Sequence, residues 1–185
     1  FCVWLHVFFQ VGSPRSGDYV QDNEHGLSEH MDHFLVSFHE PVSPQNQVVY
    51  FQMENADEQM LSDIFRNYAA EYFLPKKETY RGKTIIVYPL SHEEFIAAYI
   101  EDTYFVVSYQ KRLIEEVIDA QMDDTSLNND VLFSQIIARK KSSEFLTLYT
   151  QTPSMPILKM NQPCWCEYDF HLNSDVVYLT GETFG

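Results

Sequence analysis

The sequence predicts an α+β fold in which amphipathic helices pack on a largely antiparallel sheet. Short runs of β-branched and aromatic residues, such as 84–88 and 104–109, are too short for ordinary helices and favour strands. Two stretches, 60–73 and 113–122, place apolar residues in adjacent pairs every four positions, which is typical of a helix with one buried face. Residues 164–180 show the alternation and central turn of a β-hairpin.

The chain divides into an apolar start with a connection, 1–28, and a single α+β domain, 29–185. Residues 1–11 are almost all apolar and predict either the first strand or the trailing end of an apolar anchor. Residues 12–28 are rich in Gly, Ser, Asp and Asn and predict a mobile connection. Because the sequence begins with Phe rather than Met, we expect a preceding segment in the full protein.

Two capping-box patterns, each with Glu three residues after the capping side chain, predict helix starts. Asn55 opens the helix through 60–73, and Ser91 opens a short helix through 95–100. Residues 76–83 predict a basic turn. The other expected elements are strands at 30–39, 48–53 and 144–151 and a helix at 131–140. A strand leading into an acidic amphipathic helix occurs twice, which indicates a repeated strand–helix unit.

The charge of the chain excludes some partners. Twelve Lys and Arg residues against 27 Asp and Glu give a formal net charge of −15. Such a chain repels a phosphate backbone and lacks the counterion release that drives most nucleic-acid binding. No apolar run reaches the length of a membrane-spanning helix. We therefore expect no nucleic-acid partner, and membrane attachment only through an anchor N-terminal to Phe1.

Three polar clusters have the composition of a functional site, and each also has a simpler explanation. The four histidines within 25–39 could bind a metal together with Glu29 or Asp32, although the polar, loop-like sequence around them favours solvated side chains. The carboxylates flanking 95–100 could act as paired acids, although capping and solvation account for them. The segment 123–130 could hold calcium, but it lacks the EF-hand spacing and glycine. The cluster members are His25, His30, His33 and His39; Glu93, Glu94, Glu101 and Asp102; and Asp123, Asp124, Asn128, Asn129 and Asp130.

No recognisable catalytic or cofactor motif is present. The G-x-S-x-G elbow of serine hydrolases is absent, and the six glycines form no phosphate-binding loop. We therefore predict that the protein is not an enzyme, and we assign no catalytic, cofactor-binding or metal-binding residue.

The three cysteines leave two interpretations open. Cys164 and Cys166 lie two residues apart in an extended segment, too widely spaced for an unstrained disulfide. In an oxidising compartment Cys2 could pair with either of them, and otherwise all three remain thiols.

Four segments carry a resemblance to a known family: 80–85 (YRGKTI), 105–121 (FVVSYQKRLIEEVIDAQ), 127–133 (LNNDVLF) and 165–181 (WCEYDFHLNSDVVYLTG). Over roughly residues 80–185 the chain resembles an uncharacterised domain-of-unknown-function family of membrane-anchored, extracytoplasmic proteins from Gram-negative anaerobes. Trp165, Asp169 and Gly181 match its pattern as hairpin and packing positions, and no catalytic residue is carried over. The resemblance implies a periplasmic or cell-surface protein held by an N-terminal anchor.

The function expected from these observations is a non-enzymatic extracytoplasmic module that binds another envelope protein or packs in an assembly. Abundant Tyr, Phe and Trp beside acids suggest an alternative, a small-molecule or glycan-binding domain, which needs a concave apolar pocket. A third interpretation is a hydrolase that uses the carboxylates or the histidines, which requires these groups to converge in one cleft. The sequence does not indicate an oligomeric state.

Overall fold

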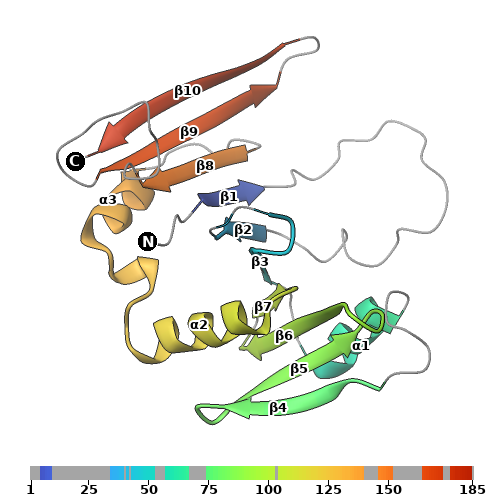
Figure 1. Cartoon of the computed structure of the whole chain (residues 1–185). Helices are drawn as coiled ribbons and strands as arrows, with labels where there is room; N and C mark the ends of the chain where they lie inside the picture. Colours follow the sequence, from blue (N-terminus) through green and yellow to red (C-terminus); the bar gives the residue numbers. More distant parts are fainter. Residues whose placement is uncertain are drawn as a thin grey trace.

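The computed structural model describes residues 5–9, 34–39, 41, 43–52, 57–66, 74–102, 104–139, 146–151, 164–172 and 176–184. Within these residues, ten strands form one sheet in the order β10-β9-β8-β1-β2-β3-β7-β6-β5-β4, and every pairing is antiparallel (Figure 1). The strands are β1 (Leu5–Phe9), β2 (Phe34–Phe38), β3 (Gln47–Gln52), β4 (Lys76–Tyr80), β5 (Lys83–Pro89), β6 (Phe95–Glu101), β7 (Tyr104–Ser108), β8 (Leu146–Gln151), β9 (Trp165–Leu172) and β10 (Val177–Phe184). The predicted α+β class with a largely antiparallel sheet is confirmed.

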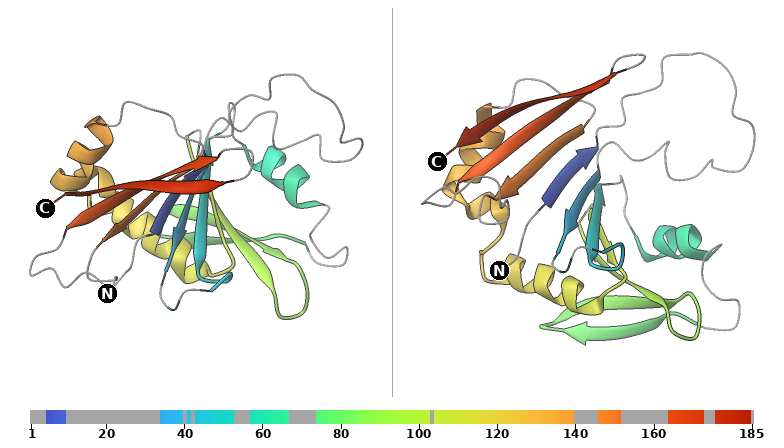
Figure 2. Two further views of the ribbon diagram at one scale, coloured as in Figure 1. Left: turned by 90° about the horizontal axis from the view of Figure 1, so that it is seen from above. Right: turned by 45° about the horizontal axis from the view of Figure 1, so that its top comes forward.

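The helices α1 (Glu58–Arg66) and α2 (Lys111–Met122) cover opposite faces of the sheet (Figure 2). Val106 of β7 packs in the cluster that contains Ile114 of α2, whereas its neighbour Phe105 packs in the cluster that contains Leu61 of α1. Successive strand residues point to opposite faces, so this half of the sheet is buried on both sides. The apolar runs of β5, β6 and β7 follow from that double burial.

The helix α3 (Val131–Arg139) follows a single 3₁₀ turn, Leu127–Asn129, and packs on β8 and β9 in the other half of the sheet. Phe133 of α3 packs on Tyr149 and Trp165, with ring centroids 5.4 and 4.9 Å apart. The strand pairing runs from Tyr149 of β8 through β1 and β2 to Val48 of β3, and directly paired positions lie on the same face of a sheet. Val48 packs against α2. The helices α2 and α3 therefore lie on the same face.

The strand–helix unit expected from the sequence has a counterpart in the topology. The series β1-β2-β3-α1 and β5-β6-β7-α2 each run as three antiparallel strands followed by a helix. They meet where β3 pairs with β7, and their strand orders are reversed about that junction.

The short helix predicted through 95–100 is wrong, because these residues form β6. Ser91 Oγ accepts hydrogen bonds from the backbone N–H groups of Glu93 and Glu94, at 3.3 and 3.1 Å, as in a capping box. The chain then extends between β5 and β7 and buries Ala97 and Ala98. Pairing on both sides overrides the local helical signal, because a side-chain cap also suits a turn.

The basic turn predicted for 76–83 is also largely wrong, because the chain forms β4 before it turns. Only Arg81 and Gly82 are in the turn, with φ of 46° and 82°. Two consecutive positive φ angles are typical of the tight turn that joins antiparallel strands.

Several expected boundaries differ from the structure or lie outside the described residues. The helix α1 begins at Glu58, and Asp57 Oδ1 accepts a hydrogen bond from Met60 N–H at 2.7 Å. The predicted cap, Asn55, and the predicted continuation, 67–73, lie outside the described residues, as do the expected connection, 12–28, and the turn at 173–174. The apolar start contains β1, which lies between β8 and β2 in the sheet.

Candidate interaction surface

The strand β10 combines an open sheet edge with exposed apolar side chains. It pairs with β9 over its full length, and within the described strands it has no neighbour on its other side. Val177, Tyr178 and Leu179 are 57%, 52% and 51% exposed. Because consecutive residues point to opposite faces, apolar surface is exposed on both sides of the same edge. We call the outer side of Val177–Phe184 the β10 edge.

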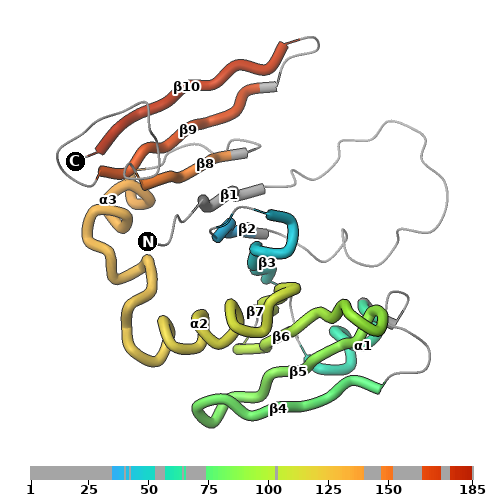
Figure 3. The backbone as a smooth tube through the Cα atoms, viewed as in Figure 1, coloured from blue at the N-terminus to red at the C-terminus, as the bar shows by residue number. Residues whose placement is uncertain are grey.

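The high exposure follows from the lengths of the last three strands. β8 pairs with β9 only from Trp165 to Phe170, whereas β10 pairs with β9 as far as Leu172. The end of the β9–β10 hairpin therefore projects past β8, as the backbone trace in Figure 3 shows. Tyr178 stacks on His171 across this end, with ring centroids 4.9 Å apart.

Gly181 lets an aromatic ring lie flat on the hairpin. It pairs with Tyr168 of β9, and a Cβ atom built on Gly181 would lie 2.7 Å from Tyr168 Cδ1. The glycine therefore creates room for the ring, and the ring covers backbone that glycine leaves bare. This contact orders the strand that presents the edge.

The face of the hairpin that α3 partly covers is acidic. Glu167 lies directly opposite Glu182, and Asp169 lies opposite Thr180. Thr147 Oγ1 donates a hydrogen bond to Asp169 Oδ1 at 2.6 Å. Glu182 is exposed and belongs to β10 itself, so its carboxylate borders the open edge.

The opposite edge of the sheet, β4, has different chemistry. Lys76 and Lys77 are exposed there and form ion pairs with Glu78 and Glu58. Lysines on an outer strand hinder pairing with another strand, because added strands must accommodate their charge. The two edges therefore differ: β4 carries protective lysines, and β10 contains no Lys, Arg or Pro.

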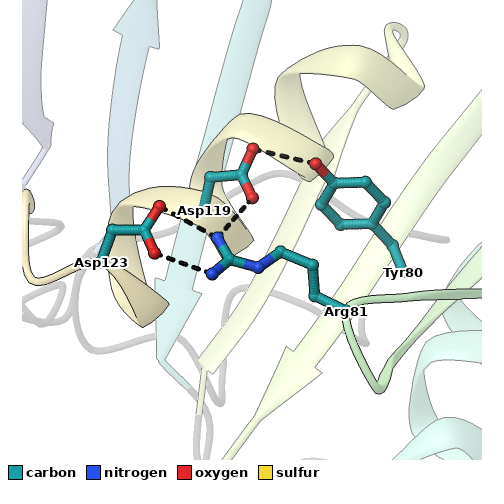
Figure 4. A network of polar contacts seen from close by, with 4 residues as sticks. All are labelled: Tyr80, Arg81, Asp119 and Asp123. Atoms are coloured by element: carbon teal, nitrogen blue, oxygen red, sulfur yellow. Dashed lines mark hydrogen bonds and ion pairs between the residues drawn. The ribbon is translucent and has the colours of Figure 1, made fainter.

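The turn after β4 is fastened to α2 by the network in Figure 4. Arg81 donates hydrogen bonds from Nη1 to Asp119 Oδ1 at 2.8 Å and from Nη2 to Asp123 Oδ1 at 2.7 Å. Tyr80 Oη donates to Asp119 Oδ2 at 2.9 Å. The guanidinium holds the pKa of Asp123 below its ordinary value. Every charge in this network has a partner, so the geometry is that of a structural fastening.

The histidine cluster is only partly within the described residues. His25, His30 and His33 lie outside them, and His39 is buried with Nε2 3.1 Å from Ser37 Oγ. Burial lowers the pKa of His39 below its ordinary value. No set of three potential metal-binding side chains gathers among the residues that the structure describes.

The Ser37–His39 contact resembles a nucleophile–base pair, and sequence reasoning did not identify it. Ser37 is 0% exposed, so no substrate atom can reach its hydroxyl in this structure. Ser37 and His39 both lie in the segment 30–39, where the alternation of apolar residues predicted a strand and no site. We interpret the pair as a polar contact within the core.

The predicted carboxylate pairs are not brought together. Glu93 and Glu94 precede β6, whereas Glu101 is its last residue and Asp102 follows it. The six strand residues 95–100 separate the two pairs by about 20 Å, well beyond the spacing of paired catalytic acids. Glu101 instead binds Lys83 Nζ through both oxygens at 2.7 Å.

The predicted calcium segment is used for turns and caps. Asp130 Oδ1 accepts a hydrogen bond from Phe133 N–H at 2.8 Å and so caps α3, as the alternative interpretation of this loop predicts. Asn129 Nδ2 donates to the carbonyl oxygen of Asp124, which has a φ of 53°. Asp123 binds Arg81, as described above.

Two of the three cysteines lie within the described residues. Cys164 and Cys166 are buried beside Trp165, and Cys166 Sγ lies 3.6 Å from Thr183 Oγ1. Cys2 lies outside the described residues, so its pairing stays a prediction.

The sequence placed the hairpin correctly but did not indicate its exposed edge. Strand order depends on pairings between distant segments, and alternation alone does not show which strand is outermost. The one available signal was the run of apolar residues on both faces of 176–179, without a charge.

Comparisons with known proteins add no identification. No family model, curated protein or solved structure matches the chain. Among the described residues, no helix combines the length and apolar character needed to cross a membrane.

Proposed function

We propose that this chain is a non-catalytic module of the cell envelope that binds another protein by accepting an extended segment of it along the β10 edge. The observation that carries the proposal is the exposure of Val177, Tyr178 and Leu179 on a strand with an open side. Strand addition of this kind uses main-chain hydrogen bonds for affinity and alternate side chains for specificity.

The contrast between the two sheet edges supports this proposal. Proteins usually protect outer strands with lysine, proline or a short length, because an open edge pairs readily with other chains. β4 follows that rule, whereas β10 is eight residues long and apolar at its projecting end. An unprotected edge on one side only is expected where a partner normally binds.

The periplasmic or cell-surface location is part of the proposal and is supported by the resemblance of residues 80–185. The alternative of a glycan-binding domain receives less support. Of the tyrosines that are exposed in the described part of the chain, Tyr104 and Tyr109 lie at opposite ends of β7, and Tyr178 lies on β10. These rings do not form one binding platform.

The proposal is tested with a neutral peptide as long as β10, in which Val alternates with Thr and Gln. We expect the peptide to slow hydrogen–deuterium exchange of amides in 177–184, because added strand pairing protects the outward-facing N–H groups. Leu179→Lys should weaken binding by about fivefold, since a charge replaces one apolar contact with the added strand.

The matched control is Leu74→Lys, the same substitution at a side chain that is 89% exposed near the opposite edge. It should leave peptide binding unchanged. Strand addition at this edge would be contradicted if both substitutions weakened peptide binding equally. It would also be contradicted if the peptide, at any concentration, failed to slow hydrogen–deuterium exchange in 177–184.

A further inference from the structure

The three strands nearest the β10 edge carry acids but no Lys or Arg. β8, β9 and β10 contain Glu167, Asp169 and Glu182, and their sequences include no Lys or Arg. From 142 to the end of the sequence the only Lys or Arg is Lys159, against five acids. A segment added beside β10 therefore meets a negative field.

The register concentrates this charge on one face. Glu167 and Glu182 are directly opposite, and the next pair on the same face is Asp169 with Thr180. Like charges directly opposite one another destabilise an antiparallel pair. A cation on an added strand would lie beside Glu182 and relieve that repulsion. The other face of the hairpin presents Val177 and Leu179, which favour apolar side chains.

We infer that the segment accepted at the β10 edge alternates Lys or Arg with apolar residues, with its cations on the face of Glu167 and Glu182 and its apolar side chains on the face of Leu179. This inference rests on the proposed function and specifies the partner of that same edge. Alternation matches the two faces because side chains of a strand change face at every residue.

A second copy of this chain fits the edge less well. Each copy carries a net charge of −15, and another β10 would bring its own Glu182 without a cation. The β4 edge of a second copy does present lysines, but Lys76 and Lys77 already pair with Glu78 and Glu58. A basic segment of a different protein is therefore the better electrostatic match.

The test compares three peptides of equal length in which Val alternates with Lys, with Glu, or with Thr and Gln. At low salt we expect the Lys peptide to bind about tenfold more tightly than the Glu peptide. The difference should shrink as salt is added, because Glu182 is exposed to solvent. Hydrogen–deuterium exchange should place the bound Lys peptide at 177–184.

Glu182→Gln should reduce the Lys-over-Glu preference, and Glu93→Gln should not. Glu93 is an exposed carboxylate on the far half of the sheet, so both variants change the net charge equally. A preference that both variants reduce alike would reflect overall charge and would overturn the inference.

The outcomes separate this inference from the proposed function. Binding of all three peptides at β10 with equal affinity would keep strand addition and end the charge specificity. Binding by none of them would end both. Concentration-dependent association of the chain alone, with protection of 177–184, would assign the edge to a second copy and overturn the inference.

Discussion

At Gly181 the absence of a side chain is a packing requirement. Most residues fit the backbone of an edge strand. A glycine there normally weakens pairing, because it has no side chain to pack. Here the Tyr168 ring occupies the space that a Cβ atom would need. A side chain at position 181 would therefore have to displace that ring.

We predict that Gly181→Ala lowers the free energy of unfolding by about 1–3 kcal/mol, because the new methyl group displaces the ring of Tyr168. Chemical denaturation measures the change. In a Tyr168→Ala background the same substitution should be nearly harmless, since the ring that it displaces is gone. An equal effect in both backgrounds would show that the ring is not the cause.

At the scale of elements, ion pairs and hydrogen bonds fasten the β4–β5 hairpin to α2 and β6. Arg81 adopts a left-handed conformation that usually favours Asn or Gly, and its contacts with Asp119 and Asp123 offset that strain. Lys83 binds Glu101, whose Oε2 also accepts a hydrogen bond from Tyr99. These contacts hold the outer strands of this half against the core.

These ion pairs predict an acid-sensitive stability. Hydrogen bonds from Lys83 and then Tyr99 lower the pKa of Glu101, and those from Arg81 lower the pKa of Asp123. Because the folded pKa values lie below the ordinary values of 4.5 and 3.8, the stabilisation is complete above those values. It is lost as the pH falls through the folded pKa values.

The melting temperature should therefore fall as the pH is lowered from about 5 to about 3. Lys83→Met should make this fall shallower, because Glu101 then loses the cation that lowers its pKa. Thermal unfolding at a series of pH values measures the effect. Parallel profiles for the two proteins would contradict the assignment to this ion pair.

At the scale of the whole molecule, one sheet joins two halves that α1, α2 and α3 cover unequally. The half that contains β5, β6 and β7 is buried on both faces, whereas β10 is exposed on both. This asymmetry confines the proposed binding to one end of the sheet, far from the ion pairs of β4.

The proposed envelope location predicts that the full-length protein fractionates with membranes and that external protease reaches it in intact cells or in cells with a permeabilised outer membrane. We expect this result because the resemblance implies an N-terminal anchor. A cytoplasmic marker protein, resistant to protease in the same cells, is the control. If the protein is instead recovered in the same fraction as the cytoplasmic marker and resists protease as the marker does, the envelope location is wrong.

The sequence by itself determined the elements whose signals are local. Periodic apolar pairs located α2 and the buried residues Leu61 and Phe65 of α1, and alternation located the final hairpin. The α+β class follows from these elements, because each buries one face and needs a partner layer.

Tertiary structure decided everything that depends on which segments meet. The residues 95–101 became β6 because β5 and β7 supply hydrogen bonds on both sides, and β4 formed because β5 lies beside it. The sequence also did not determine that the β10 edge is exposed, because the order of all the strands in the sheet decides which strand is outermost. Strand pairing is non-local, and so the surface proposed here for binding emerged only from the folded chain.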